Sequence, residues 1–179
     1  MKKIIINFLL LAGVFTFSSC IKQIDKNFSG QTAVEFDATV VNTATTPYTY
    51  HVATRTPPFG IPTTTVNSTA ITRTLTTPVL LRVNLVGPQR AADEVIQYRV
   101  LTDVTPASPN LLAIQGTHFT TGNTLTIPKD SSFGQVVINI LNSGTSSTNP
   151  REVHLELIGN ESIKASENYK KVGIRIAQN

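Results

Sequence analysis

Short stretches of alternating apolar and polar residues recur along the chain, and this period of two restricts the fold more than any other feature. VLLRVNLV (79–86) sends four apolar side chains to one face, and QVVINIL (135–141) sends three. Seven further segments show the pattern, over residues 33–40, 48–54, 69–75, 95–101, 124–128, 153–158 and 172–176. Such segments, separated by turn residues, are typical of strands that bury one face. The sequence therefore predicts an all-β fold, a single antiparallel immunoglobulin-like β-sandwich of about 7–9 strands over residues 33–179.

Three segments depart from the regular alternation. SPNLLAIQG (108–116) and NESIKASENYK (160–170) leave room for a helical turn. Residues 38–92 contain no acidic residue and are rich in threonine, which suits the exposed face of a strand, so a solvated sheet face is the simpler interpretation. The alternative is an edge that binds a partner or exchanges strands, and its candidate contact is the uncharged apolar loop of Pro57, Pro58, Phe59 and Ile61.

The N-terminus has the parts of a bacterial export signal, a basic start, an apolar run over 4–17 and two serines. The run is shorter than the ~20 residues of a spanning helix, so we expect residues 1–19 to act as a signal peptide. FSSC resembles the lipobox of bacterial lipoproteins, with Phe17 where that motif usually carries Leu. The resemblance implies that Cys20 begins the mature chain and is acylated. The alternative is a free, buried cysteine.

The composition after residue 19 restricts the partners. Without Lys2 and Lys3, 13 of the 15 basic residues remain against 11 acidic ones, a net charge of +2, so nucleic acid is not an implied partner. The single cysteine allows no internal disulfide, and stability must come from an apolar core. In residues 20–32 we expect the acylated cysteine and a flexible tether, which spans at most ~40 Å.

The second half of the chain resembles a Calx-β-type repeat. That family has an A-x-x-G turn followed by an aromatic residue, a T-L-x-[FI] hairpin and a closing E-x-[FV]-x-[VL]-x-L strand. Ala113, Gly116 and Phe119 take the first places, and 124–128 and 152–157 take the others. The chain also resembles a family of small Bacteroidota outer-membrane lipoproteins with such a domain, often encoded beside starch-utilisation-type transporter and lipoprotein pairs.

The loops in which Calx-β domains bind Ca²⁺ are altered in this sequence. Ca²⁺ takes six to eight oxygen ligands, several of them carboxylates. His118 stands at the position of the turn aspartate, and residues 142–150 (NSGTSSTNP) replace the acidic loop without a carboxylate. Glu152 and the distant Asp130 make a poor cage. We therefore expect no calcium, and no other metal or cofactor.

No catalytic constellation stands out either. Alternation points His51 and His154 outward, so solvated strand positions are expected for them rather than a metal site that also uses His118. The adjacent carboxylates Asp93 and Glu94 precede a strand, which favours a turn or capping role over acid–base chemistry. With no G-x-S-x-G elbow and no free cysteine, we predict that the protein is not an enzyme.

The remaining interpretations concern binding and assembly. We expect a lipid-anchored, non-enzymatic binding or accessory protein of the outer membrane, on its periplasmic or its surface face, associated with a nutrient (glycan) uptake system. Its partners would be the membrane, through Cys20, and an outer-membrane transporter complex or a polysaccharide. The chain has no Trp to form a sugar platform, which favours a protein partner. The alternative is a fimbrial or adhesin-like subunit assembled by strand addition after cleavage at Arg55 or Arg73.

Overall fold

The computed structural model describes residues 30–41, 43–57 and 68–179. Within these residues, eleven strands form one hydrogen-bonded network, and a short helix follows the first strand. In chain order the elements are β1 (Ala33–Phe36), α2 (Ala38–Val41), β2 (Val52–Ala53), β3 (Val79–Val86), β4 (Glu94–Val100), β5 (Leu111–Leu112), β6 (Phe119–Thr121), β7 (Thr124–Ile127), β8 (Phe133–Ile140), β9 (Arg151–Gly159), β10 (Lys164–Ala165) and β11 (Lys171–Ile176).

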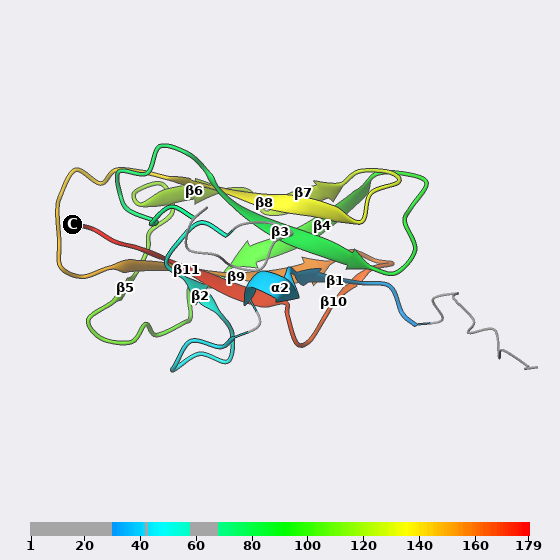
Figure 1. Cartoon of the computed structure of the whole chain (residues 1–179), viewed down its shortest axis with the longest axis horizontal. Coiled ribbons are helices and arrows are strands. Elements are labelled where there is room, and N and C mark those ends of the chain that lie inside the picture. Colours follow the sequence, from blue (N-terminus) through cyan, green and yellow to red (C-terminus); the bar gives the residue numbers. More distant parts are fainter. Residues whose placement is uncertain (1–29, 42, 58–67) are drawn as a thin grey trace, which may run out of the picture.

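The strands lie in two layers, and Figure 1 shows β6 and β8 in one layer and β9 and β11 in the other. Both layers belong to one network because β1 pairs with β3 on one side and with β10 on the other. The full order is β2-β11-β9-β10-β1-β3-β8-β6. β4 changes partner along its length, since Glu94–Gln97 pairs with β7 and Gln97–Val100 pairs with β9. The predicted all-β architecture is confirmed.

The alternation in β3 and β8 produces the core between the layers. Val79, Leu81 and Val83 of β3 are buried, as are Val136 and Ile138 of β8. The two strands pair antiparallel with Leu81 opposite Val136, so both apolar rows face the same side. Burying one such side chain stabilises the fold by about 1.5–3 kcal/mol. For these strands the predicted inward face is confirmed.

The sheet is mixed rather than purely antiparallel as predicted. The pairs β1–β10, β2–β11 and β5–β9 are parallel. Each pair includes a strand of only two residues, which is too short to produce a visible alternation in the sequence. Two of these strands, β5 and β10, lie inside the segments that were predicted to allow a helical turn, and they raise the number of strands above the predicted range.

The helix α2 falls where the sequence predicted the second half of a strand, over 33–40. Asp37 Oδ1 accepts hydrogen bonds from the N–H of Thr39 at 3.1 Å and from its hydroxyl at 2.7 Å. The carbonyl of Asp37 accepts the N–H groups of Val40 and Val41. An aspartate at this position caps the start of a helix. The strand therefore stops at Phe36, and the prediction for the next four residues was wrong.

The predicted strand over 48–54 is also shorter than expected. Thr45 N–H donates to Tyr50 O at 3.0 Å, and Tyr48 N–H donates to Thr45 O at 2.7 Å, so a compact turn occupies its first half. Only Val52 and Ala53 pair with β11. The predicted strand over 69–75 is reduced to isolated bridges at Ala70 and Thr72. The turn matters for the site, because it lies over β9.

Candidate functional site

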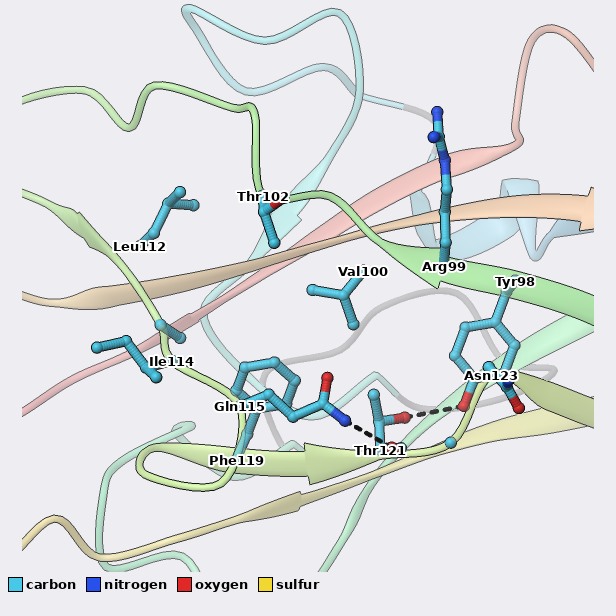
Figure 2. A pocket seen from close by; sticks show the side chains of 12 residues that line it. Tyr98, Arg99, Val100, Thr102, Leu112, Ile114, Gln115, Phe119, Thr121 and Asn123 are labelled. Atoms are coloured by element: carbon cyan, nitrogen blue, oxygen red, sulfur yellow. Dashed lines mark hydrogen bonds between the residues drawn. The ribbon is translucent and has the colours of Figure 1, made fainter.

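An open groove of about 730 Å³ lies between the end of β4, the chain after β5 and the connection from β6 to β7. Figure 2 shows Val100 in the middle, Leu112 and Ile114 to its left, and Phe119 below them. The groove exists because the chain crosses from β6, which pairs with β8, to β7, which pairs with β4. It is lined by Tyr98, Arg99, Val100, Thr102, Leu112, Ala113, Ile114, Gln115, Phe119, Thr121, Gly122 and Asn123.

The floor of the groove is held by a chain of hydrogen bonds. Thr121 Oγ1 donates to Val137 O at 2.8 Å, so Tyr98 Oη donates in turn to Thr121 Oγ1 at 2.9 Å. Gln115 Nε2 donates to Thr121 O at 3.1 Å and joins the opposite wall to the floor. The rings of Tyr98 and Phe119 are almost fully buried. The floor is therefore part of the core and is already formed without a ligand.

The mouth of the groove is aliphatic with one charged residue. Ile114 is 58% exposed, while Leu112 and Val100 are half-buried. Among the described residues of the lining, only Arg99 is charged, and its side chain is 60% exposed. Arg99 donates through Nε and Nη2 to Glu156 Oε2, at 2.9 and 2.6 Å. The Arg99 side chain points away from Val100, to the other face of β4 (Figure 2), so the side chains that face the groove mouth are aliphatic.

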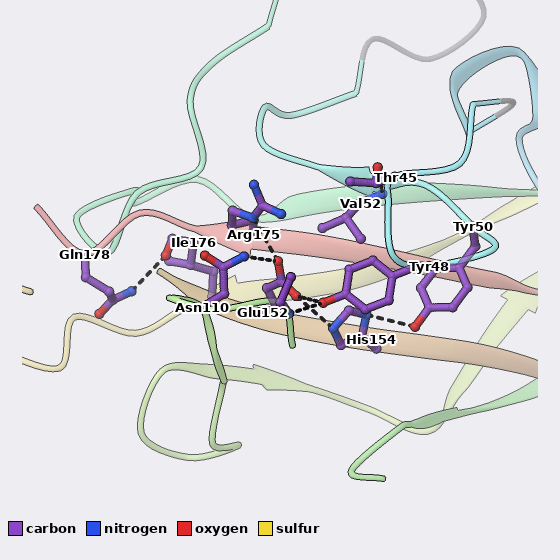
Figure 3. Close-up of polar contacts among 11 residues, drawn as sticks. Thr45, Tyr48, Tyr50, Val52, Asn110, Glu152, His154, Arg175, Ile176 and Gln178 are labelled. Carbon is purple, nitrogen blue, oxygen red and sulfur yellow. Dashed lines mark hydrogen bonds and ion pairs between the residues drawn. The ribbon is translucent and has the colours of Figure 1, made fainter. Parts of the chain in front are cut away.

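A second polar site, on the outer face of β9, is sealed. Glu152 and His154 are both 0% exposed, although alternation predicted solvated positions for this face of the strand. That prediction was wrong because the turn at Tyr48 and Tyr50 covers the face, as Figure 3 shows. The ring centroids of Tyr48 and Tyr50 lie 4.9 and 5.7 Å from that of His154, and Tyr50 Oη lies 3.1 Å from His154 Nδ1.

Four groups surround the Glu152 carboxylate. Oε1 accepts from Asn110 Nδ2 and Arg175 Nε, each at 2.8 Å. Oε2 accepts from the Tyr48 hydroxyl and lies 3.3 Å from His154 Nε2. Burial alone would raise the pKa of Glu152, but the close approach of His154 and the hydrogen bonds from Tyr48 and Arg175 lower it to about 2. An ionised carboxylate with both oxygens occupied fastens the turn to the sheet.

The surroundings of this cluster also raise the pKa values of its two tyrosines. Burial raises the pKa of Tyr50 to about 12, and the neighbouring Tyr48 and Glu152 act in the same direction. Burial and the hydrogen bond to Glu152 also raise the pKa of Tyr48. Both hydroxyls therefore stay protonated at neutral pH and serve as hydrogen-bond donors. Sequence reasoning missed this cluster, because its members are separated by more than a hundred residues, as in the pair Tyr48–Glu152.

The three histidines lie in different settings. His51 Nδ1 lies 2.9 Å from Thr43 O, and His118 Nδ1 accepts the N–H of Ile114 at 3.0 Å. Burial lowers the pKa of His118, which suits this acceptor role. His154 belongs to the sealed cluster. In the described residues, no group of three or more His, Cys, Asp or Glu is placed to hold a metal ion.

Of the other residues singled out from the sequence, Pro57 and Asp93 are described, and neither lines the groove. Cys20, Pro58, Phe59 and Ile61 are outside the described residues, while Pro57 is half-buried over β1 and α2. Asp93 Oδ1 accepts the N–H of Lys129 at 2.8 Å, a structural contact. Across the described ranges, no helix is both long and apolar enough to cross a membrane.

The two arginines proposed as cleavage points are both engaged. Arg55 donates to the Ser68 hydroxyl at 2.9 Å and to the carbonyl of the same residue. Arg73 donates to Asn142 Oδ1 at 2.6 Å and to Gln178 O at 3.0 Å. Cleavage after Arg55 would release β1, which carries the buried core residues Val34 and Phe36.

Comparison with known proteins identifies the fold of this chain but no sequence family. No family model and no curated protein sequence matches the chain. Among solved structures, the apo form of the Calx CBD1 domain is similar with a TM-score of 0.52 at 11% identity, covering 84% of this chain and 99% of that one. A two-domain Bacteroides fragilis protein of unknown function is similar with a TM-score of 0.51 at 10% identity, covering 82% of this chain and 45% of that one. The protein therefore has a Calx-β-like fold, which confirms the likeness inferred from its second half.

Proposed function

We propose that this protein is a lipid-anchored, non-enzymatic binding protein of the outer membrane, and that it docks a partner protein of a nutrient (glycan) uptake system through the groove beside β4. The observation that carries the proposal is the groove itself, about 730 Å³ of open space with an aliphatic mouth above a preformed floor. Exposed apolar surface of this kind marks interaction sites in soluble domains. The groove is therefore assigned to recognition.

The lining favours a protein segment over a polysaccharide. Glycan sites usually present a flat aromatic face to the apolar side of a sugar ring. The two aromatic residues of the groove, Tyr98 and Phe119, are 3% and 0% exposed, so neither offers its ring as a platform. The accessible walls come from Val100, Leu112 and Ile114. Aliphatic walls are complementary to the apolar side chains of a protein.

The buried cluster supports a role without catalysis. A general base must come within hydrogen-bonding distance of the proton that it removes. Glu152 and His154 are the carboxylate and imidazole that lie together, and both are 0% exposed beneath the Tyr48–Tyr50 turn. Their hydrogen bonds are used to hold that turn. The cluster therefore supports a structural rather than a chemical function.

The anchor is supported by the sequence of the first twenty residues. A multiply acylated Cys20 would supply the two or more hydrophobic attachments that stable anchoring requires. The first strand begins at Ala33, so about a dozen residues separate the lipid from the fold and span at most ~40 Å. A partner in the same membrane is within reach of the groove.

The test is a pulldown of the C-terminally tagged full chain from intact cells, with surface protease treatment and membrane fractionation of the same samples. Ile114→Asp places a charge at the groove mouth. Ile158→Asp is the matched control, because Ile158 is 48% exposed on β9, against 58% for Ile114, and does not line the groove. Cys20→Ala tests the anchor.

We expect transporter subunits to be recovered with the wild-type chain and with Ile158→Asp, and to be lost with Ile114→Asp. Cys20→Ala should leave the membrane fraction. Equal recovery with Ile114→Asp and Ile158→Asp would refute the assignment of the groove. Laddered self-assemblies that lack the residues before Arg55 or Arg73 would instead favour a fimbrial subunit, in which the released β1 leaves an acceptor position between β3 and β10.

A further inference from the structure

One edge of β4 is uncovered where the strand borders the groove. β7 pairs with β4 over Glu94–Gln97, and one more hydrogen bond joins Tyr98 N–H to Asn123 O at 2.9 Å. Beyond Tyr98, none of the strands in the described ranges pairs with β4 on this side. On the other side, β9 pairs with β4 as far as Val100. The last part of β4 is therefore an edge that opens into the groove.

The bonds to β9 fix the direction of the Val100 backbone. Leu101 N–H donates to His154 O at 2.8 Å, so the N–H of Leu101 points toward β9. In an antiparallel pair, successive residues direct their N–H and C=O groups to opposite sides. The N–H and C=O of Val100 therefore point away from β9, into the groove that Val100 lines. These are the groups that an edge strand presents to an additional strand.

The side chains around this edge match the alternation of a strand. Val100 borders the groove on one side, and Leu112 and Ile114 form the facing wall (Figure 2). Successive side chains of an extended chain point to opposite faces. A segment paired with β4 would direct every second side chain toward these aliphatic residues and the Phe119 floor. The remaining side chains would face solvent.

The outer face of β4, beside the open edge, carries an excess of positive charge. The Arg99 side chain points to this face, away from Val100 (Figure 2), and its partner Glu156 is also approached by Lys171 at 3.7 Å and Lys170 at 4.0 Å. Three cations therefore surround one carboxylate, and the second carboxylate in contact with them is Glu167, on Lys170 at 2.7 Å. This excess of positive charge favours a negative group among the solvent-facing side chains of a segment paired with β4.

We propose that the edge of β4 at Val100 accepts an extended segment of a partner protein as an added strand, with alternating apolar residues and an acidic residue next to Arg99. The inference rests on the proposed docking function and specifies its mode. In this mode, main-chain hydrogen bonds provide affinity and the side-chain contacts provide specificity. An exposed ion pair adds a modest increment.

The experiment selects peptides from a random phage-displayed library, of about seven residues to match a strand, on the full chain purified from membranes in detergent. The best peptides are then synthesised in two N-methylated forms, one with the even and one with the odd amides methylated. An added strand uses only every second N–H, so one form should bind about tenfold more weakly and the other nearly as well as the parent. Arg99→Gln should weaken acidic peptides about threefold.

Two variants separate this inference from the proposed function. Val100→Pro removes the N–H that points into the groove. Proline is tolerated where the N–H lies on the unpaired side of an edge, and thermal melting checks that the variant folds. Gly122→Val narrows the groove, because Gly122 lines it and the added side chain occupies part of its space. The first added atom, a Cβ, would lie 3.5 Å from Tyr98 Oη, which is an ordinary contact distance. Val100→Pro should weaken peptide binding about tenfold, and Gly122→Val should abolish it.

Each outcome decides a different claim. If both methylated forms bind equally, or if no peptide is enriched, strand addition at β4 is refuted. If Gly122→Val and Ile114→Asp also leave partner capture unchanged, the proposed docking function is refuted as well. If these two variants abolish capture while Val100→Pro and methylation have no effect, the groove binds its partner, but not by strand addition. Enriched peptides that match a segment of this chain, together with self-association in solution, would replace the partner protein by a second copy and overturn the proposed occupant.

Discussion

Glu152→Gln should destabilise the fold in a pH-dependent way, because it removes the buried charge and keeps the shape of the side chain. The pKa of Glu152 falls from its ordinary value of 4.5 to about 2 in the folded protein. A carboxyl with a lowered pKa in the folded state contributes stability above its unfolded pKa and loses it as the pH falls. At about 1.4 kcal/mol per pKa unit, the contribution at pH 7 is about 3 kcal/mol.

The expected pH dependence of the free energy of unfolding follows from the two pKa values of Glu152, 4.5 in the unfolded chain and about 2 in the folded protein. Between pH 7 and about pH 3, the wild-type carboxylate loses about 2 kcal/mol of its contribution, whereas the glutamine has no such loss. The difference in the free energy of unfolding between the two proteins should therefore narrow by that amount. The glutamine amide can also add a fixed destabilisation where its N–H groups meet a donor. That destabilisation would be the same at pH 7 and pH 3, so the change in the free-energy difference between the two pH values would stay the same.

Urea unfolding followed by far-UV circular dichroism measures this difference at the two pH values. With a slope of about 2 kcal/mol per molar urea, the midpoint at pH 7 should fall by about 1.5 M. Glu161→Gln, at an exposed position after β9, serves as the control and should leave the midpoint nearly unchanged. A difference between wild type and Glu152→Gln that is the same at both pH values would refute the assignment of a strongly ionised, hydrogen-bonded Glu152.

Three further outcomes follow from the structure. Gly159→Ala should cost about 2–4 kcal/mol, measured by urea unfolding, because Gly159 has φ of 92° and an added Cβ would lie 2.2 Å from Ile163 O. Phe119→Ala should cost about 3–5 kcal/mol and lower the melting temperature by about 10 °C, because its ring is 0% exposed in the groove floor; a small shift would contradict that packing. Cys20→Ala should abolish incorporation of labelled fatty acid, and labelling that persists would contradict acylation at this residue.

The long strands could be predicted because their pattern is local. In β3 and β8, alternation alone identified inward positions such as Leu81 and Val136, and both are buried opposite each other. The Calx-β likeness was visible in the same way, from Gly116, Phe119 and the closing strand. These features depend on residues that are close in sequence, and hydrophobic burial on one face is sufficient to specify them.

The short strands could not be predicted from the local sequence pattern. β5 and β10 have two residues each. β5 pairs with β9, and β10 lies between β9 and β1, so each has a partner that is distant in sequence. The groove was missed for the same reason, since its walls come from β4, from the chain after β5 and from the β6–β7 connection. The helix α2 is different, because it could have been predicted from the sequence. Asp37 caps its start, and an aspartate at this position is a recognisable sequence signal.

The sequence by itself determined the all-β class, the inward rows of the long strands and the expectation of an export signal that ends before Cys20. Tertiary structure alone decided which outward faces are covered. Alternation correctly placed His154 on the side of β9 opposite the core row, but it carries no information about what lies beyond that side. A turn 104 residues away covers it, and this long-range contact buries His154, which was predicted to be solvated, together with Glu152.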